Sequence, residues 1–339
     1  MRLYIFNFND DKNYWKKAWS FALIFTLIII TIIEIFWRTS GHQTNITDDK
    51  VLWSMQREMI GHTDKEIILV GASRIQTGIC KKCVEKMLPE YRVFNLSIDS
   101  SCPKGVLVDI ANDEKIKGII ICSIVSEWIL FCNNQKAFKD YIDFYHKEYN
   151  FNLKLNKMIG NLIQNNIVSV DPYLNLTRVG RIMLLDKELP VPNYVRTSKD
   201  RIRKLDYSKT DLQKHKMNRL KMTYHLYKTE EDKINLSAFI DAVYDLEVYV
   251  KKIQERGGTV VFVRFPIAIQ HFTLDQKFYP KSIYWDTFSK ITSSETIHFK
   301  EIEGMKNLSI PDTSHIDYKD SPKFTEILIN EIKARGIVK

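Results

Sequence analysis

The amino-acid sequence predicts an α/β fold in which a parallel sheet carries helices on both faces, preceded by one transmembrane helix. The chain has 339 residues, which is enough to bury a large core. Short, uninterrupted apolar runs alternate with helical patterns in two parts of the chain, as expected of strands buried on both faces of a parallel sheet. A single, longer apolar run lies near the N-terminus. Together these observations predict a membrane-anchored α/β protein.

The N-terminal apolar run, residues 18–37, reads AWSFALIFTLIIITIIEIFW and contains one charged residue, Glu34. A helix of about 20 residues, rising roughly 1.5 Å per residue, just crosses a hydrocarbon core of about 30 Å. The alternative, a cleaved signal peptide, would have a shorter apolar region followed by small residues. Here Phe36, Trp37 and Arg38 close the run, so we interpret it as an uncleaved anchor.

The basic residues around this run predict its orientation. More Lys and Arg side chains precede the span than follow it closely, where only Arg38 is found before two aspartates. The positive-inside rule then places residues 1–17 in the cytoplasm and the rest of the chain outside the cytoplasmic (inner) membrane. The preceding basic residues are Arg2, Lys12, Lys16 and Lys17. Nucleic acid is not expected as a partner on that side of the membrane.

Residues 38–64 are expected to form a connector with some helix, and residues 65–339 the main domain. The first part of this domain alternates strand and helix patterns. The predicted strands are 66–70, 92–96 and 117–124, and the predicted helices are 80–88 and 105–113.

The same alternation returns late in the chain. Residues 237–256 are predicted to form a helix, because apolar residues recur at three- and four-residue intervals until Gly257 and Gly258. A strand follows over 259–265 and stops at Pro266. Further helices are predicted over 284–291 and 322–335.

Residues 133–236 are predicted to be a helical insertion, because the alternation of strand and helix is lost there. Within them, residues 196–228 are dense in Lys and Arg. Such a run is usually the solvated face of a helix. The alternative is a surface that contacts anionic lipid headgroups or an anionic polymer.

The pairing of the cysteines stays open in the sequence. Cys80 and Cys83 form a C-x-x-C motif, and three more cysteines follow, so the count is odd. An extracytoplasmic domain could pair them, and a redox role for Cys80 and Cys83 is an alternative. No second pair has the spacing of a zinc site. The remaining cysteines are Cys102, Cys132 and Cys122, the last in a run that predicts a buried strand.

Ser73 follows the first predicted strand and is preceded by Gly71 and Ala72. Open α/β sheets bind ligands beyond the carboxyl ends of their strands, so this hydroxyl would be presented there. The small neighbours would let a substrate carbonyl approach, and a following helix would direct N–H groups at developing negative charge. The alternative is a serine that caps the helix, which is the better interpretation of Ser73 considered alone.

Asp312 and His315 stand three residues apart in a loop that follows Pro311. This spacing lets one short turn hold the carboxylate against imidazole Nδ1 and leave Nε2 for a serine. Asp317 is an alternative partner that the spacing does not exclude. Together with Ser73, these residues supply the nucleophile, base and orienting acid of serine acyl-transfer chemistry.

Four segments resemble, in this order, the SGNH/GDSL hydrolase-like superfamily: GASRIQTG, VFNLSIDSS, TVVFVRFP and IPDTSHIDYKDSPKFT. The resemblance is closest to a membrane-anchored bacterial branch that works beside membrane-bound O-acyltransferases in the modification of cell-envelope polysaccharides. It covers about residues 64–135 and 237–335 and leaves the insertion unmatched.

The resemblance implies a flavodoxin-like three-layer fold with Ser73 as nucleophile, His315 as base and Asp312 as orienting acid. Arg74 matches the residue after the nucleophile in this branch and is a candidate for substrate binding, the alternative being a surface cation or a salt bridge. Arg264, at the end of a predicted strand, is a second candidate that would face the same pocket and bind an anionic group.

The oxyanion hole departs from the pattern of the family. The superfamily usually adds a Gly from its second block and an Asn from its third to the backbone N–H of the serine, here Ser73. In this chain Ser100 stands where Gly is expected, and residues 123–128 contain no Asn. Asn95 is either a structural residue or a donor. Loss of one donor costs roughly 3–4 kcal/mol of transition-state stabilisation, so other N–H groups substitute or the protein is slow or inactive without a partner.

Two functions are consistent with these residues. The first is an acyltransferase that carries an acyl group, most plausibly acetyl, on Ser73 and passes it to a hydroxyl of a cell-envelope glycan; attack by water instead would make it a carbohydrate esterase. The second is a weakly active or inactive accessory protein that binds the polymer or a membrane-bound O-acyltransferase. The altered oxyanion blocks favour the accessory protein, and the intact Ser73, Asp312 and His315 favour the enzyme. No cofactor or metal is expected for either.

Overall fold

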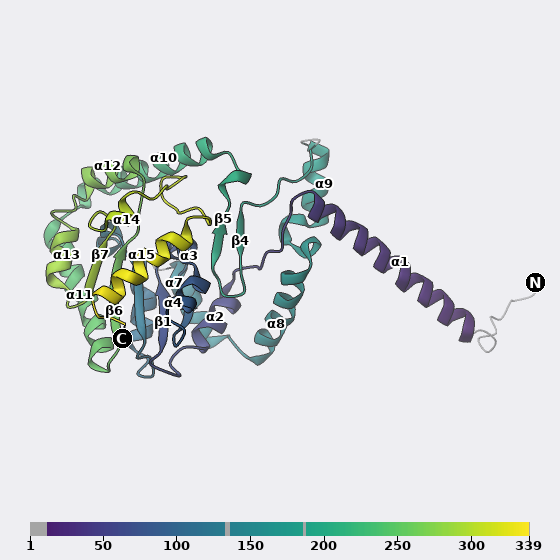
Figure 1. Cartoon of the computed structure of the whole chain (residues 1–339), viewed down its shortest axis with the longest axis horizontal. Helices are drawn as coiled ribbons and strands as arrows, with labels where there is room; N and C mark the ends of the chain where they lie inside the picture. The colour runs from purple at the N-terminus through teal and green to yellow at the C-terminus, as the bar shows by residue number, and fades with distance from the viewer. Residues whose placement is uncertain (1–11, 133–135, 186–187, 339) are drawn as a thin grey trace, which may run out of the picture. The chain divides into compact units, whose positions relative to one another are not determined.

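A computed structural model describes residues 12–132, 136–185 and 188–338 (Figure 1). Arg2 and the rest of residues 1–11 of the predicted cytoplasmic segment lie outside the described residues, as do 133–135 and 186–187 of the predicted insertion. The chain forms two compact units. The smaller contains the residues up to Asn45 together with Ile163–Asn193, and the larger contains Ile46–Leu162 and the residues from Tyr194 onward.

The smaller unit is built on helix α1, Lys12–Thr39. Within it, Tyr14–Thr39 is the one described helix that is long and apolar enough to cross a membrane, and it contains the predicted span. The carboxylate of Glu34 accepts hydrogen bonds from the backbone N–H groups of Val168 and Ser169, at 2.8 and 2.9 Å. The segment that packs on this end of α1 contains the 3₁₀ turns η1 (Val168–Val170) and η2 (Pro172–Leu174) and helix α9 (Leu176–Leu185).

The larger unit contains a five-stranded sheet with the strand order β2-β1-β3-β6-β7, and every neighbouring pair is parallel. Numbered along the chain, these five strands have the order 2-1-3-4-5, one of the two common orders of doubly wound α/β sheets. The strands are β1 (Glu66–Val70), β2 (Arg92–Asn95), β3 (Ile119–Ser123), β6 (Thr259–Arg264) and β7 (Glu295–His298).

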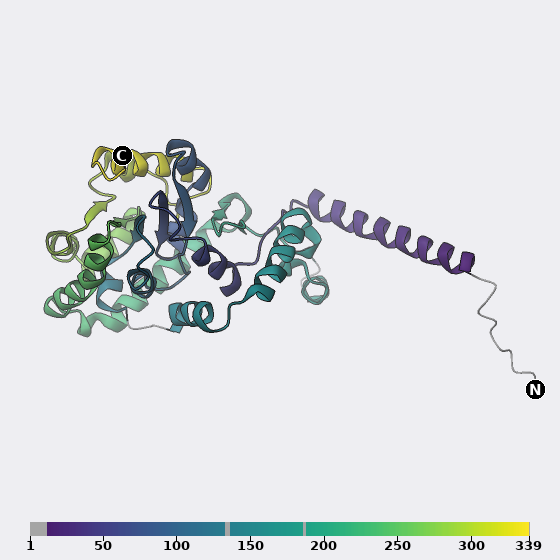
Figure 2. The same ribbon diagram turned by 90° about the horizontal axis from the view of Figure 1, so that it is seen from below.

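Helices cover both faces of this sheet (Figures 1 and 2). Alternate residues of a strand point to opposite faces, so Ile68 and Val70 belong to one apolar core while Ile67 and Leu69 belong to the other. The first core is closed by α2 (Lys50–Glu58), α5 (Lys104–Ala111), α11 (Leu236–Glu255) and α13 (Trp285–Ile291). The second is closed by α3 (Ser73–Gly78), α4 (Lys81–Met87), α14 (Glu303–Lys306) and α15 (Ser321–Ala334).

The predicted α/β class and four of the five parallel strands are confirmed; the bounds of β1 are as predicted, and those of the other three differ by at most two residues. Strand β7, Glu295–His298, was not predicted. It lies at the edge of the sheet, and Glu295 at its start is exposed. A short edge strand needs no continuous apolar run, so its sequence signal is weak.

Most of the remaining elements lie in the predicted insertion. A two-stranded antiparallel ribbon is formed by β4 and β5. The other elements of the larger unit are α6 (Ser126–Leu130), α7 (Lys136–Lys147), α8 (Phe151–Asn166, whose last turn belongs to the smaller unit), β4 (Val195–Thr197), β5 (Arg203–Leu205), η3 (Tyr207–Lys209), α10 (Leu212–Glu230), η4 (Glu231–Lys233) and α12 (Ile269–Phe278).

The structure pairs four of the five cysteines. Cys80 forms a disulfide with Cys83, and Cys102 forms one with Cys132. Cys122 is free and buried in β3, as its apolar surroundings predicted. The odd count is therefore explained by one packing residue and two disulfides.

Candidate active site

The loop after β1 positions Ser73. Gly71 has a φ of +148°, in a region that side chains rarely adopt. A Cβ atom at this position would lie 2.9 Å from Cγ2 of Ile75 and 2.9 Å from Cβ of Ser123. The chain therefore turns against the end of β3 only because residue 71 is glycine, and Ser73 becomes the first residue of α3.

Ser73, His315 and Asp312 form one hydrogen-bonded chain. Oγ of Ser73 lies 2.8 Å from Nε2 of His315, and Nδ1 of His315 lies 2.8 Å from Oδ2 of Asp312. Because an ionised carboxylate only accepts hydrogen bonds, Nδ1 carries the imidazole proton and Nε2 accepts from the serine hydroxyl. Ala72, and not Ser73, holds the N-cap position of α3, so the Ser73 hydroxyl is not a helix cap.

The turn between Asp312 and His315 holds the carboxylate in place. Oδ1 of Asp312 accepts the backbone N–H groups of Ser314 and His315, at 2.9 and 2.7 Å. Thr313, which directly follows Asp312, has a φ of +77°, a strained conformation for a β-branched residue. Burial would raise the pKa of Asp312, but the hydrogen bond and charge of His315, the N–H of Ser314 and the charge of Arg219 together lower it well below its ordinary value.

Asp317, the alternative partner, does not contact His315 by a described hydrogen bond. Its carboxylate accepts the backbone N–H groups of Lys319, at 2.9 Å, and Tyr207, at 3.3 Å. Asp317 therefore caps backbone, and Asp312 is the carboxylate that orients the imidazole.

A cavity of about 390 Å³ opens beside Ser73. Ser73, Ser100 and Ser123 line it where β1, β2 and β3 end, which is the edge at which parallel strands present their carboxyl ends. Apolar side chains complete much of its wall, namely Val125, Trp128, Phe131, Met222 and Leu226.

One wall of this cavity comes from the insertion. Six residues of α10 line it, and their spacing from the first (i, i+3, i+4, i+7, i+8 and i+11) places them on one face of the helix: Arg219, Met222, Thr223, Leu226, Tyr227 and Glu230. Helix α10 lies beside α12 (Figure 1). The basic run 196–228 therefore contributes to two surfaces of α10. Lys214, Lys221 and Lys228 are exposed to solvent, whereas the opposite face of the helix lines the cavity beside Ser73.

Arg74 extends along the same cavity. Its Nε donates to Oγ of Ser314 at 3.1 Å, and its Nη2 lies 3.5 Å from Nε2 of His271. Among the described side chains, no carboxylate lies within 4.0 Å of this guanidinium. Burial, followed by the positive charge of Arg264, lowers the pKa of Arg74 to about 10.

Arg264 does not line the serine cavity, contrary to the prediction. Its guanidinium is buried, pairs with the carboxylate of Asp275 and donates to the carbonyl of Phe265 at 3.4 Å. It lines a smaller adjoining cavity instead. Because its guanidinium is already paired with Asp275, Arg264 is not free to bind an anion in the serine cavity.

Among the titratable residues of the cavity that were missed in the sequence, two have strongly shifted pKa values. Glu127, in α6, lies near Asp275 and Arg74, and burial followed by the charge of Asp275 raises its pKa to about 7. His271 is 2% exposed, and burial followed by the charge of Arg74 lowers its pKa to about 3, so it is neutral. The position of Glu127 just after a predicted strand is the one signal that could have indicated it.

Ser100 keeps the backbone conformation that a glycine would adopt. Its φ is +54°, in the left-handed region, and it lines the cavity together with Ser73. Ser73 is the first helical residue, so its N–H has no partner within α3. The backbone N–H groups of Ser73 and Ser100 are accordingly the candidate oxyanion donors.

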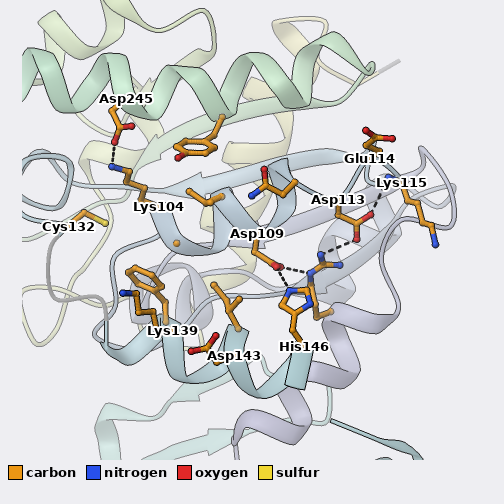
Figure 3. A pocket seen from close by; sticks show the side chains of 17 residues that line it. Lys104, Asp109, Asp113, Glu114, Lys115, Cys132, Lys139, Asp143, His146 and Asp245 are labelled. Atoms are coloured by element: carbon orange, nitrogen blue, oxygen red, sulfur yellow. Dashed lines mark hydrogen bonds and ion pairs between the residues drawn. The ribbon is translucent and has the colours of Figure 1, made fainter. Parts of the chain in front are cut away.

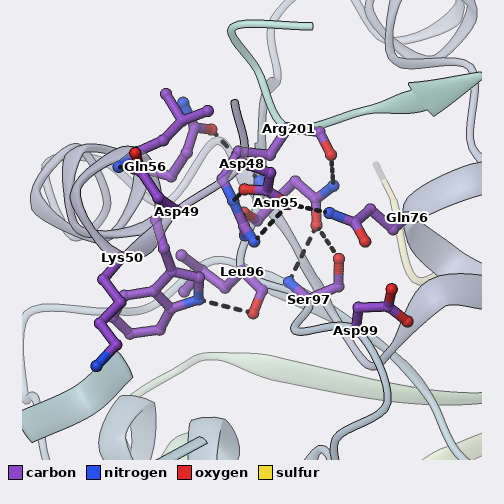
Figure 4. A network of polar contacts seen from close by, with 12 residues as sticks. Asp48, Asp49, Lys50, Gln56, Gln76, Asn95, Leu96, Ser97, Asp99 and Arg201 are labelled. Atoms are coloured by element: carbon purple, nitrogen blue, oxygen red, sulfur yellow. Dashed lines mark hydrogen bonds and ion pairs between the residues drawn. The ribbon is translucent and has the colours of Figure 1, made fainter. Parts of the chain in front are cut away.

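Asn95 belongs to a buried network and not to the cavity wall (Figure 4). Its amide Nδ2 donates to the carbonyl of Arg201 at 2.8 Å, and its Oδ1 accepts from the N–H and the hydroxyl of Ser97. The guanidinium of Arg201 pairs with Asp48 and donates to the Asn95 carbonyl. Asn95 therefore holds the loop after β2. Of its two predicted roles, the structure supports the structural one and not that of an oxyanion donor.

A larger cavity of about 920 Å³ lies elsewhere, with α5, α7 and α11 contributing its wall (Figure 3). Its buried charges are paired: Asp109 accepts from Nε of Arg57 and contacts Nε2 of His146, each at 2.6 Å. Its lining contains no serine or threonine, and Cys132 is in a disulfide. We place the candidate active site at Ser73 because its hydroxyl is hydrogen-bonded to a base, Nε2 of His315.

No protein-family model, curated protein or solved structure shows a significant match to this chain. The interpretation of the site therefore depends on its geometry and on the sequence resemblance.

We expect the substitution Gly71→Ala to destabilise the protein by about 2–4 kcal/mol, because the new methyl group overlaps Ile75 and Ser123 and φ is unfavourable for alanine. Urea unfolding of the purified protein measures this change. Gly160→Ala is the matched control, since nothing lies within 4 Å of a Cβ there; as a helical position it should be neutral or stabilising by up to about 1 kcal/mol. Equal effects of the two substitutions would contradict the argument.

We expect Asp312 to make stability depend on acid. Its pKa is lower in the folded protein than its ordinary value of 3.8, so the stabilisation is present above about pH 4 and is lost as the pH falls toward the folded pKa. The substitution Asp312→Asn should remove this part of the acid dependence and cost about 1.5–3 kcal/mol at neutral pH. Urea unfolding of both proteins across the acid range measures it, and parallel curves would refute the role of the carboxylate.

Proposed function

We propose that this protein is a membrane-anchored, extracytoplasmic serine acyltransferase or esterase of the SGNH type that acts on O-acyl groups of a cell-envelope glycan. The observation that carries the proposal is the chain of two 2.8 Å contacts from Ser73 through His315 to Asp312. The doubly wound strand order is compatible with the flavodoxin-like fold that the resemblance implies.

In the proposed reaction, Oγ of Ser73 attacks the carbonyl carbon of an acyl donor while Nε2 of His315 takes the hydroxyl proton. Asp312 stabilises the resulting imidazolium. The oxyanion of the tetrahedral intermediate would be bound by the N–H groups of Ser73 and Ser100. When the intermediate collapses, the bond from carbon to the leaving group breaks, His315 returns the proton to that group, and an ester on Ser73 remains.

The second half of the reaction runs these steps in reverse with a new acceptor. His315 removes a proton from a sugar hydroxyl, whose oxygen attacks the ester carbonyl and releases Ser73 with its proton restored. If water is the acceptor, the product is a free acid and the protein is an esterase. The wall that α10 adds to the cavity favours transfer, because exclusion of water from the site would protect the ester.

The proposed location outside the cytoplasm has two supports. One is the apolar helix α1 with its excess of preceding basic residues. The other is the pair of disulfides, since disulfides persist in oxidising compartments. We further propose that a membrane-bound O-acyltransferase supplies the acyl group, as in the bacterial branch that the sequence resembles.

We also propose that Arg74 binds a negatively charged group of the substrate. Its guanidinium lines the cavity, is fixed at Nε by Ser314 and has no described carboxylate within ion-pair distance. Glu127, also on the cavity wall and electrostatically coupled to Arg74, is an acid whose charge would compete with a bound anion.

The substitution Ser73→Ala should abolish catalysis, because it removes the nucleophile. We expect hydrolysis of an aryl acetate by the purified protein, and polymer acylation in cells, to fall roughly 10³-fold or more. Ser237→Ala, at an exposed position of α11, is the matched control. Unchanged acylation in cells carrying Ser73→Ala would instead identify the protein as a non-catalytic accessory factor.

Binding of an anionic substrate should weaken as the pH rises through about 7, because Glu127 then ionises near Arg74. We expect KM for an anionic ester to rise over this interval in the wild type and to stay constant in Glu127→Gln. Arg74→Gln should raise KM about tenfold or more, as loss of a charged hydrogen bond of about 1.5–3 kcal/mol predicts, and should leave KM for a neutral ester unchanged. A rise in KM that is equal for both esters would contradict anion binding.

A further inference from the structure

Helix α8, Phe151–Asn166, turns its apolar side away from the protein. None of its residues is buried. Its exposed apolar side chains recur at the spacing of one helix face and are between 41% and 72% exposed, namely Phe151, Leu155, Met158, Ile159, Leu162 and Ile163. Side chains of this kind normally face a core, so the stripe requires a partner.

The polar side of α8, and not its apolar side, packs against the rest of the protein. The side chain of Lys157 is only 10% exposed, and its Nζ binds the carboxylate of Asp49 at 2.7 Å and the carbonyl of Thr47 at 2.6 Å. Lys154 pairs with Glu58 at 2.8 Å. These contacts fix the rotation of the helix, so the apolar stripe cannot turn inward without breaking them.

The last turn of α8 belongs to the same compact unit as the membrane helix. The carbonyl of Asn166, the final residue of α8, accepts a hydrogen bond of 2.7 Å from Arg38. Arg38 in turn pairs with Glu34 near the end of α1. The apolar stripe ends at Ile163, one helical turn before Asn166, and therefore next to the end of the apolar span.

We propose that α8 lies in the lipid headgroup region of the membrane that α1 crosses, with its apolar stripe among the upper acyl chains. A helix of 16 residues that carries Lys154 and Lys157 is too short and too polar to cross the hydrocarbon core, and it has the amphipathic pattern of an interfacial helix. The occupant is lipid because the stripe ends at Ile163, in the turn whose last residue, Asn166, accepts a hydrogen bond from Arg38 at the end of the apolar span.

The smaller unit supports this assignment independently. At the end of α9, the side chains of Met183, Leu184 and Leu185 are 51%, 81% and 68% exposed, while Arg178 and Arg181 of the same helix could reach anionic headgroups. The inference rests on the membrane anchoring included in the proposed function, but not on the serine chemistry.

Depth-dependent quenching tests the proposal on the full-length protein in vesicles of phosphatidylcholine and phosphatidylglycerol. The variant Ile159→Cys carries an environment-sensitive fluorophore, since the one free cysteine, Cys122, is buried. We expect a blue shift on reconstitution and loss of most of the emission with nitroxide lipids labelled near the headgroup, with much less loss when the nitroxide lies deep. Met158→Cys provides a second probe on the same stripe.

Two controls decide the outcome. Leu27→Cys, in the apolar span, should be quenched by the deep nitroxide, which verifies insertion of α1. Glu326→Cys, an exposed position of α15, should not be quenched. If Leu27 is quenched while Ile159 and Met158 are not, the lipid assignment is overturned and a protein partner covers the stripe. Quenching at Glu326 equal to that at Ile159 would also overturn it. Neither outcome depends on the activity of Ser73.

Discussion

The parallel direction of all five strands is the constraint on which the rest of the site depends. Because the strands run the same way, the loops that follow them meet at one edge, and residues far apart in sequence line one cavity there. The approach of Gly71 to the backbone of Ser123 sets how closely two of these loops pack. Ser73 then starts α3 at a position where its hydroxyl reaches His315, which comes from the far end of the chain.

Buried charges at this edge are mostly neutralised in pairs. Arg264 is held by Asp275, and Arg201 is held by Asp48. Each pair offsets the cost of removing its members from water. Arg74 lacks such a described carboxylate, so the hydrogen bond to Ser314 offsets only part of the free energy that its desolvation costs. A residue of this kind is expected where a site is built to receive a ligand.

The insertion supplies two amphipathic helices that are used in different ways. Helix α10 gives one face to the serine cavity and exposes Lys214, Lys221 and Lys228 to solvent, so it forms one wall of the site. Helix α8 does the reverse, with lysines bound to the protein and apolar side chains exposed.

The sequence alone determined the α/β class, four of the parallel strands, the apolar span and the residues of the serine, histidine and aspartate chain. These follow from local patterns, namely apolar runs, helical periodicity and the short turn between Asp312 and His315. Strand β7, the disulfide pairing, the separation of Arg264 from the cavity and the role of Asn95 were decided only by the tertiary structure. Each depends on which distant group the residue contacts in the folded chain. Arg264 forms an ion pair with Asp275, and the side chain of Asn95 donates a hydrogen bond to the backbone carbonyl of Arg201. Spacing along the chain cannot reveal such partners, because packing of the sheet and its loops brings them together.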